Sequence, residues 1–134
     1  MRCFRSAVWV SALTGSLVLC IGLPATASPP LRWNSPFEVT SGVPVTVSSI
    51  IPCPPAPTAS DPVLVEIDLM FPQGGGSGQI LTANPDGSWS GAVTFVFYGV
   101  SGKATLSADC REFTGVAGVV YVHYQTRHVR ILPS

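Results

Sequence analysis

Paired carboxylates are the first feature of the sequence with a chemical use. Glu66 and Asp68 lie two residues apart in a segment where apolar and polar residues alternate, so both side chains are expected on one face of a strand. Such a pair can exchange protons or bind a cation. No third acidic residue lies near enough in the sequence to complete a calcium loop, so the pattern favours a solvated polar face.

Other candidates for chemistry lack the arrangement that their chemistry needs. His123 and His128 are five residues apart, and an odd separation places them on opposite faces of a regular strand, so only a bulge between them would permit joint metal binding. The glycine run at 74–78 lacks the Gly-Lys-Ser/Thr end of a phosphate loop, and Ser77 lacks the spacing of a nucleophile elbow. The sequence therefore predicts no enzyme, no catalytic residue, no metal ion and no cofactor.

Three tyrosines are the remaining candidates for a functional surface. Tyr98, Tyr121 and Tyr124 lie in the second half of the chain. Tyrosine supplies a large contact area at a low entropic cost and is enriched at binding surfaces. We therefore predict an exposed aromatic contact surface that contains these residues.

The N-terminus has the layout of a secretory signal peptide. Arg2 and Arg5 precede an uncharged apolar run over residues 7–23, and Ala25-Thr26-Ala27 follows. We predict a signal peptide over residues 1–27, cleavage after Ala27, and a secreted, extracellular or cell-envelope protein. The alternatives are an uncleaved membrane anchor, since the apolar run is almost long enough to span a bilayer, and a lipid-modified Cys20.

Cleavage would remove Cys3 and Cys20 and leave two cysteines, Cys53 and Cys110. Because the compartment outside the membrane is oxidising, this pair predicts one disulfide. Both cysteines are in phase with neighbouring apolar residues, so both thiols are expected to point into the core.

The mature part shows strand periodicity throughout and no helical pattern. Each expected strand has a set of apolar residues on one face, at Val43, Val45 and Val47; at Val63, Val65, Ile67, Leu69 and Phe71; at Trp89, Val93, Phe95 and Phe97; and at Ala104, Leu106 and Ala108. One or two further strands are expected in residues 116–132, with a bulge near Gln125-Thr126. About seven short strands in this length predict an all-β sandwich of two sheets.

Prolines and glycines divide the chain between these strands. Residues 28–36 are predicted to be a Pro-rich extended leader, and residues 37–134 the folded domain. The glycines at 74–78 predict a flexible hairpin loop, and Asn84-Pro85-Asp86-Gly87 predicts a turn that closes a hairpin.

The charge of the mature part excludes two classes of partner. It keeps five basic and seven acidic residues, a formal charge of −2, and has no basic stripe. We therefore expect no binding to nucleic acid and, after signal cleavage, none to a membrane.

A resemblance to a known family rests on three sequence elements, which are Cys53, Asp86-Gly87-Ser88-Trp89, and the segment from Gly102 to Ala108-Asp109-Cys110. With these elements, residues from about 37 to 132 resemble the small secreted immunoglobulin-like domains of bacteria, of the actinobacterial type. The resemblance implies an immunoglobulin-like sandwich. It also implies a role as a spacer, stalk or adhesion module.

Two functions follow as expectations. The first is a non-enzymatic secreted or cell-envelope module that binds an extracellular protein or glycan, or serves a structural role. The alternative is a carrier of a small ligand, with a pocket between the sheets lined by Trp89, Phe95 and Phe97.

Overall fold

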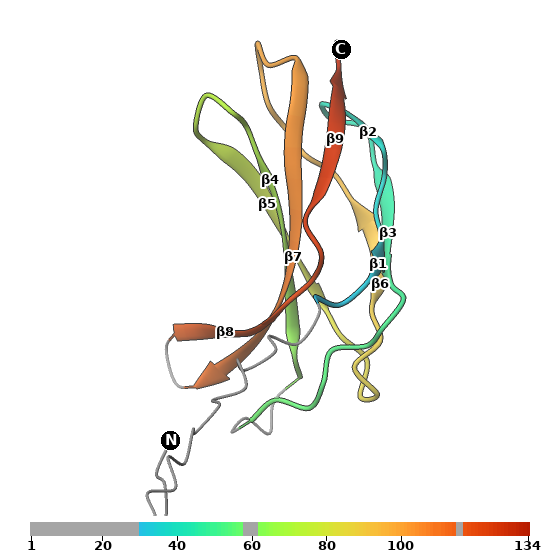
Figure 1. Cartoon of the computed structure of the whole chain (residues 1–134), viewed down its shortest axis with the longest axis vertical. Helices are drawn as coiled ribbons and strands as arrows, with labels where there is room; N and C mark the ends of the chain where they lie inside the picture. The colour runs from blue at the N-terminus through green and yellow to red at the C-terminus, as the bar shows by residue number, and fades with distance from the viewer. Residues whose placement is uncertain (1–29, 58–61, 115–116) are drawn as a thin grey trace, which may run out of the picture.

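The computed structural model describes residues 30–57, 62–114 and 117–134 (Figure 1). The predicted signal peptide, its cleavage site, Cys3 and Cys20 lie outside the described residues. The described residues form nine strands and no helix: β1 (Trp33–Asn34), β2 (Glu38–Thr40), β3 (Val45–Ser49), β4 (Leu64–Met70), β5 (Gly76–Thr82), β6 (Ser90–Val93), β7 (Gly102–Thr114), β8 (Ala117–His123) and β9 (Arg127–Leu132).

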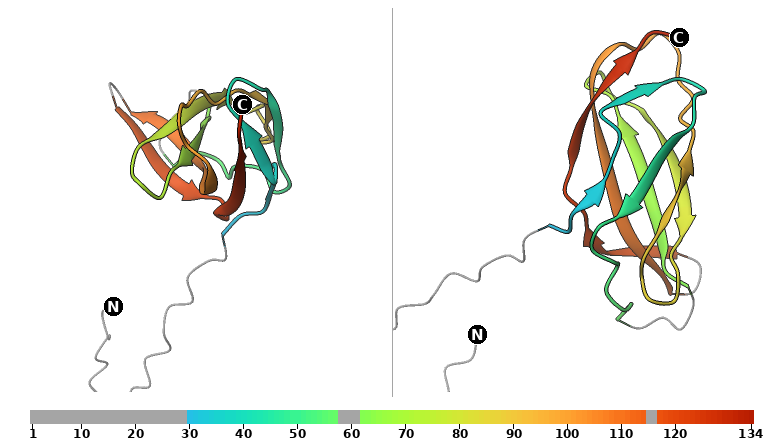
Figure 2. Two further views of the ribbon diagram at one scale, coloured as in Figure 1. Left: turned by 90° about the horizontal axis from the view of Figure 1, so that it is seen from above. Right: turned by 90° about the vertical axis from the view of Figure 1, so that its right-hand side faces the viewer.

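The strands form two sheets that pack against each other (Figures 1 and 2). One sheet has the order β1-β3-β6, and the other has the order β2-β9-β7-β4-β5, with β8 paired to the far part of β7. All pairings between strands are antiparallel except that of β2 with β9, which is parallel. The predicted all-β architecture of two sheets is confirmed.

The core lies between the two sheets, where the apolar faces of the strands meet. Val65, Ile67 and Leu69 of β4 are fully buried, and so are Leu106 and Ala108 of β7. The predicted inner faces of these two strands are confirmed. The alternation arises because both strands are central in their sheet, with one face covered and one face toward solvent. Trp89, Val93, Phe95, Phe97 and Ala104 are buried as well.

The first predicted strand differs from the observed one. Val43 is 49% exposed, and Val39 of β2 is buried instead. The reason is a turn, in which the Val43 N–H donates to the Thr40 carbonyl and Gly42 has a φ of 76°. The turn separates β2 from β3 and breaks the alternation that the sequence suggested.

The two glycine-containing turns also differ from expectation. The Asn84–Gly87 turn does not close a hairpin, since it links β5 in one sheet to β6 in the other. The 74–78 run does lie in a hairpin between β4 and β5, but its turn also contains Pro72 and Gln73. Only Gly74 and Gly75 of the run lie in the turn, and residues 76–78 belong to β5.

The predicted bulge near Gln125-Thr126 is confirmed by the pairing register. Leu106 faces Arg127 and Asp109 faces His123, so two residues of β7 oppose three residues between β8 and β9. A second irregularity occurs beside Cys110, where β8 has an extra residue. Each bulge shifts the side-chain alternation of the bulged strand by one residue.

Part of the predicted leader contributes to the sandwich. Trp33 and Asn34 form β1 and pair with β3, and the Trp33 side chain is 3% exposed. Leu31 forms a bridge to Tyr124. The packed part of the chain therefore starts before residue 37.

Candidate binding pocket

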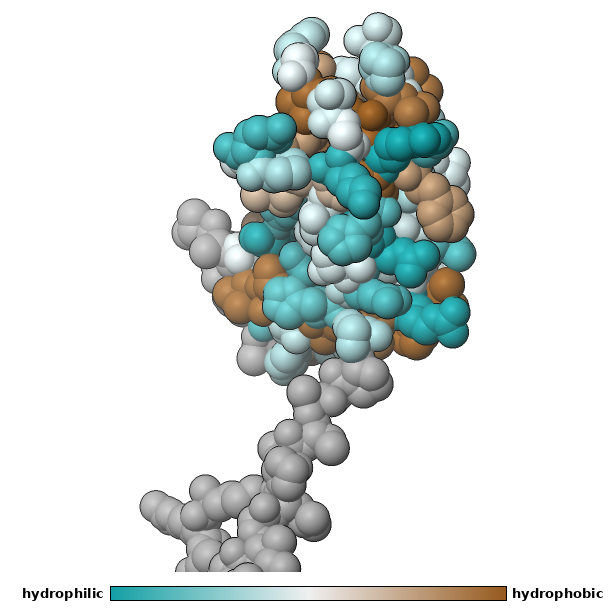
Figure 3. All heavy atoms as spheres, turned by 45° about the horizontal axis from the view of Figure 1, so that its top comes forward, coloured by the Kyte–Doolittle hydropathy of each residue, from teal (hydrophilic) through white to brown (hydrophobic). Residues whose placement is uncertain are grey.

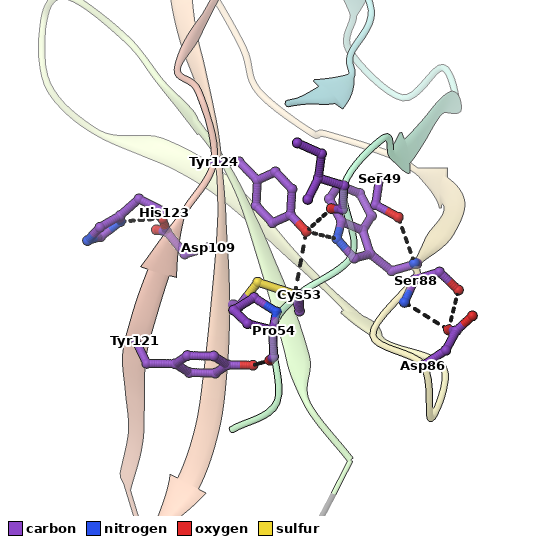
Figure 4. Close-up of a disulfide and its surroundings, with 12 residues drawn as sticks. Ser49, Cys53, Pro54, Asp86, Ser88, Asp109, Tyr121, His123 and Tyr124 are labelled. Carbon is purple, nitrogen blue, oxygen red and sulfur yellow. Dashed lines mark hydrogen bonds and ion pairs between the residues drawn. A yellow bond between two sulfur atoms is a disulfide. The ribbon is translucent and has the colours of Figure 1, made fainter. Parts of the chain in front are cut away.

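A disulfide joins the two layers near one end of the sandwich. Cys53 follows β3, Cys110 lies on β7, and their sulfur atoms are bonded (Figure 4). Both residues are buried, as the phase of the sequence predicted. Cys53 does not lie on a continuous strand, because β3 ends at Ser49, and its N–H instead donates to the Gly87 carbonyl at 2.9 Å.

Aromatic side chains fill the core beside this disulfide (Figure 4). Trp89 donates from Nε1 to the Tyr124 hydroxyl at 3.0 Å, and that hydroxyl donates to the Ile51 carbonyl at 2.7 Å. The rings of Trp89 and Tyr124 meet edge to face, at an angle of 90° between their planes. The pairing satisfies both polar groups without water, so the cluster is a sealed part of the core.

The three predicted contact tyrosines do not share a surface. Tyr124 is 3% exposed and belongs to the core, because it lies in the bulge between β8 and β9. Tyr121 is half-buried and donates its hydroxyl to the Pro54 carbonyl at 2.8 Å. Tyr98 is 88% exposed, but it lies in the connection from β6 to the start of β7, whereas β8 pairs with the other end of β7.

The space between the sheets, where a ligand pocket was expected, is filled by the aromatic side chains that were expected to line it. Trp89 and Phe95 are almost completely buried, and Phe97 packs edge to face against Phe71. None of Trp89, Phe95 and Phe97 lines either of the two pockets described next.

The larger pocket lies at the disulfide end of the sandwich and has a volume of about 440 Å³. Its walls come from three segments, namely the Pro-rich stretch after Cys53, the residues that lead into β4, and the end of β5 with its turn. The lining residues are Cys53, Pro54, Pro55, Ala56, Pro62, Val63, Thr82, Ala83, Asn84, Pro85, Asp86 and Gly87. A smaller pocket of about 230 Å³ lies beside β1.

Local contacts hold the walls of the larger pocket in place. The bond from the Cys53 N–H to the Gly87 carbonyl joins one wall to another, and the disulfide ties Cys53 to Cys110 of β7, which does not line the pocket. Tyr121 holds Pro54, and the Ala83 N–H donates to the Val63 carbonyl at 2.9 Å. These bonds fix Cys53, Pro54, Ala83 and Gly87 in the lining, so a ligand would find this part of the pocket already ordered.

The chemistry of the lining suits an apolar group. Prolines and small aliphatic residues form most of it, and Asn84 and Asp86 supply polar groups. The Ser88 hydroxyl and N–H both donate to the Asp86 carboxylate, and these hydrogen bonds lower the pKa of Asp86. The lining contains neither a histidine nor a free cysteine, so it offers surface for binding and no pair of nucleophile and base.

The exposed surface elsewhere does not gather into one apolar area on the face seen in Figure 3, where hydrophilic side chains separate the apolar ones. The large exposed apolar residues come from loops and from several strands, and they include Phe37, Val43, Ile80, Val96 and Val119. Scattered apolar residues are normal on a protein surface, so the pocket is the more specific feature.

The predicted carboxylate pair lies on the outer face of the six-stranded sheet. Glu66 forms an ion pair with Arg111, and the Asp109 carboxylate lies 2.6 Å from Nδ1 of His123, within hydrogen-bond distance. Burial raises the pKa of Asp68, and the neighbouring charges of Glu66 and Asp109 raise it further. Glu66 and Asp68 are therefore partly buried on this polar outer face and not fully solvated as the sequence suggested.

The two histidines do share a face, because the bulge between them restores the phase. His123 faces Asp109 of β7 and His128 faces Thr105, so they lie four residues apart along the neighbouring strand, about 13 Å. This separation is too long for joint ligation. The residues described by the structure contain no group of three or more side chains placed to hold a metal ion.

Asp68 leads to a prediction about pH. Its pKa is raised above the ordinary 3.8 in the folded protein, so its contribution to stability is present below pH 3.8 and is lost as the pH rises through the folded pKa. Asp68→Asn should therefore raise the melting temperature by a few degrees at neutral pH, and the gain should fade in acid. Thermal unfolding followed by circular dichroism at both pH values measures this.

Asp86→Asn is the matched control, since the pKa of Asp86 is lowered and the sign reverses. That variant should lose stability at neutral pH. A lower melting temperature for Asp68→Asn at neutral pH would contradict the assignment of a repelled carboxylate.

Comparison with known proteins finds no match, whether among family models, curated proteins or solved structures. Sequence reasoning missed the pocket, although the proline run at 52–57 and the turn at 84–87, which form its walls, were both visible as chain breakers.

Proposed function

We propose that the mature chain is an exported, non-enzymatic immunoglobulin-like module that binds a partner protein through the pocket at its disulfide end. The observation that carries the proposal is the mainly apolar pocket of about 440 Å³ beside the core. Ligand sites in proteins are concave, mostly apolar and in this range of volume.

The strand order supports the immunoglobulin-like part of the proposal. A sheet of β1-β3-β6 faces a sheet in which β7 lies between β4 and β9. In immunoglobulin domains an inter-sheet disulfide links the second strand to the sixth. The bond from Cys53, after β3, to Cys110 of β7 resembles that link. Cys53 departs from the pattern because it lies four residues beyond the end of its strand.

Export is supported by the disulfide and by the predicted signal peptide. In the described residues, no helix has the length and hydrophobicity needed to cross a membrane.

A protein partner suits the pocket better than a glycan. Sugar rings and other flat ligands are commonly held against aromatic side chains, and the lining contains none. A cup of prolines and small aliphatic residues instead fits an apolar side chain inserted by a partner protein, which is how binding hot spots are usually built.

A small-ligand carrier is the second candidate, and the volume of the pocket favours it. A cavity of about 440 Å³ is large enough for a drug-sized molecule. Such a ligand would lie at the end of the sandwich and not between the sheets.

A substitution that fills the pocket tests the proposal. Ala56 is half-buried in the lining, and Ala56→Trp adds bulk there without changing the backbone. Mature protein carrying this change should fail to retain the proteins that the unchanged protein captures from its own culture. Lys103→Trp, on the exposed start of β7, is the control and should retain them.

Equal capture by Ala56→Trp and by the unchanged protein would reject the pocket as the binding site. A small apolar compound that copurifies with the unchanged protein and is lost from Ala56→Trp would favour the carrier instead.

A further inference from the structure

Strand β5 forms an unprotected edge of the six-stranded sheet. It pairs along its whole length with β4, and within residues 30–57, 62–114 and 117–134 no strand pairs with its other side. Its seven residues contain no charge and no proline, and five of them are exposed. Native proteins usually protect such an edge with charges, prolines or bulges, because free backbone groups recruit another strand.

The hydrogen-bond pattern shows which backbone groups of β5 are free. At the two ends of the hairpin, the Ala83 N–H donates to Val63 and the Phe71 N–H donates to Gly75. In an antiparallel pair the bonded residues alternate, so the odd-numbered residues of β5 bond to β4. The N–H and C=O groups of Gly76, Gly78, Ile80 and Thr82 therefore point away from the sheet.

We infer that β5 is a dimerisation edge, which pairs antiparallel with β5 of a second copy of this chain. A two-fold axis at Gln79 gives the register that uses all four free residues of each strand. Gly76 then faces Thr82 of the second copy, and Gly78 faces Ile80. If the two-fold axis passed through Gly78 or Ile80 instead, some of the free N–H and C=O groups of β5 would have no partner in the second copy.

The side chains fit this register by size. On the outer face, Ile80 is 63% exposed and would lie over Gly78 of the second copy. A Cβ at position 78 would lie 2.6 Å from Oδ1 of Asp68, so a larger residue there would have to displace the Asp68 side chain. On the inner face, Leu81 would meet Ser77, and the two Gln79 side chains would meet each other across the axis.

The other strand edges are poorer candidates for the same pairing. Strands β1, β2 and β6 have only two, three and four residues. The edge of β8 carries a bulge, and Leu31 bonds to the backbone of His123 and Gln125 at its end. Since β5 carries no charge, two copies would meet without electrostatic repulsion along the shared edge.

Cysteine cross-linking tests both the dimer and its register. Residue 79 would face itself as a non-hydrogen-bonded pair, in which side chains are closest, so Gln79→Cys should form an intermolecular disulfide under mild oxidation. Ser77→Cys is the control, because it lies on the same face of β5 and its copies would be about 13 Å apart. The native cysteines do not interfere, since they are bonded to each other.

Light scattering of the unchanged mature protein should give the mass of a dimer, and Ile80→Lys should give that of a monomer. A monomeric mass at every concentration, or cross-linking of Ser77→Cys as efficient as that of Gln79→Cys, would overturn the inference. Because β5 contributes only Thr82 to the pocket, Ile80→Lys should keep partner binding, which separates failure of this inference from failure of the proposed function.

Discussion

Replacement of both Cys53 and Cys110 by alanine should lower the melting temperature of the mature protein by tens of degrees or prevent folding. The bond spans a sequence separation of 57 residues. In the chain-entropy model a loop of this length contributes about 4 kcal/mol to the free energy of unfolding. Because small domains have a total stability of about 5–15 kcal/mol, this is a large share. Thermal unfolding of the two proteins measures it.

The same experiment can be done without mutation, by adding a reductant to the unchanged protein. The mature protein should show no free thiol before reduction, since Cys53 and Cys110 are the cysteines that would remain after the predicted signal cleavage. Reaction of both thiols with a labelling reagent in unreduced protein would contradict the bond. If removal of the disulfide lowered the melting temperature by only a few degrees, the large contribution of this bond to stability would be contradicted.

Gly87→Ala should be the most damaging single substitution in the turn before β6. Gly87 has a φ of 85°, and a Cβ at this position would overlap the carbonyl oxygen of Cys53. Its own carbonyl also accepts the Cys53 N–H, so the backbone cannot move away without losing that bond. We expect a loss of more than about 4 kcal/mol in the free energy of unfolding, measured by denaturant titration.

Gly75→Ala is the control that separates the effect of the steric clash at Gly87 from the effect of a positive φ alone. Gly75 has a similar φ of 78°, but nothing lies within 4 Å of the position that its Cβ would take. That variant should lose roughly 1–2 kcal/mol, the usual cost of a side chain in the left-handed region. An equal loss of stability in Gly87→Ala and Gly75→Ala would contradict the close packing of Gly87 against Cys53.

The alternation of apolar residues was sufficient to predict the inner faces of β4 and β7. Both strands are long and central, so one buried face forces the pattern. It was not sufficient for β5, whose glycine-rich sequence has no alternation and whose extended form comes from pairing with β4. Strands β1 and β2 were missed because two or three residues are too few to show a period.

Side-chain roles were harder to predict than strand faces. Tyr124 was expected at the surface, but it lies in the bulge between β8 and β9, where simple alternation fails, and it is buried against Trp89. The pocket was not predictable, because its walls are the segments at 53–56, 62–63 and 82–87. Backbone hydrogen bonds from Cys53 to Gly87 and from Ala83 to Val63 bring these distant segments together, and no local sequence pattern indicates such contacts.

Photo-cross-linking from inside the pocket tests the proposed function most directly. A photoreactive amino acid replaces Ala56 in one variant and Lys103 in another, and each mature protein is irradiated in its own culture. The account predicts an adduct with a partner polypeptide from position 56, identified by mass spectrometry, and none from position 103. A polypeptide adduct from position 103 alone, or an adduct from position 56 with a small molecule alone, would contradict a protein-binding module that acts through this pocket.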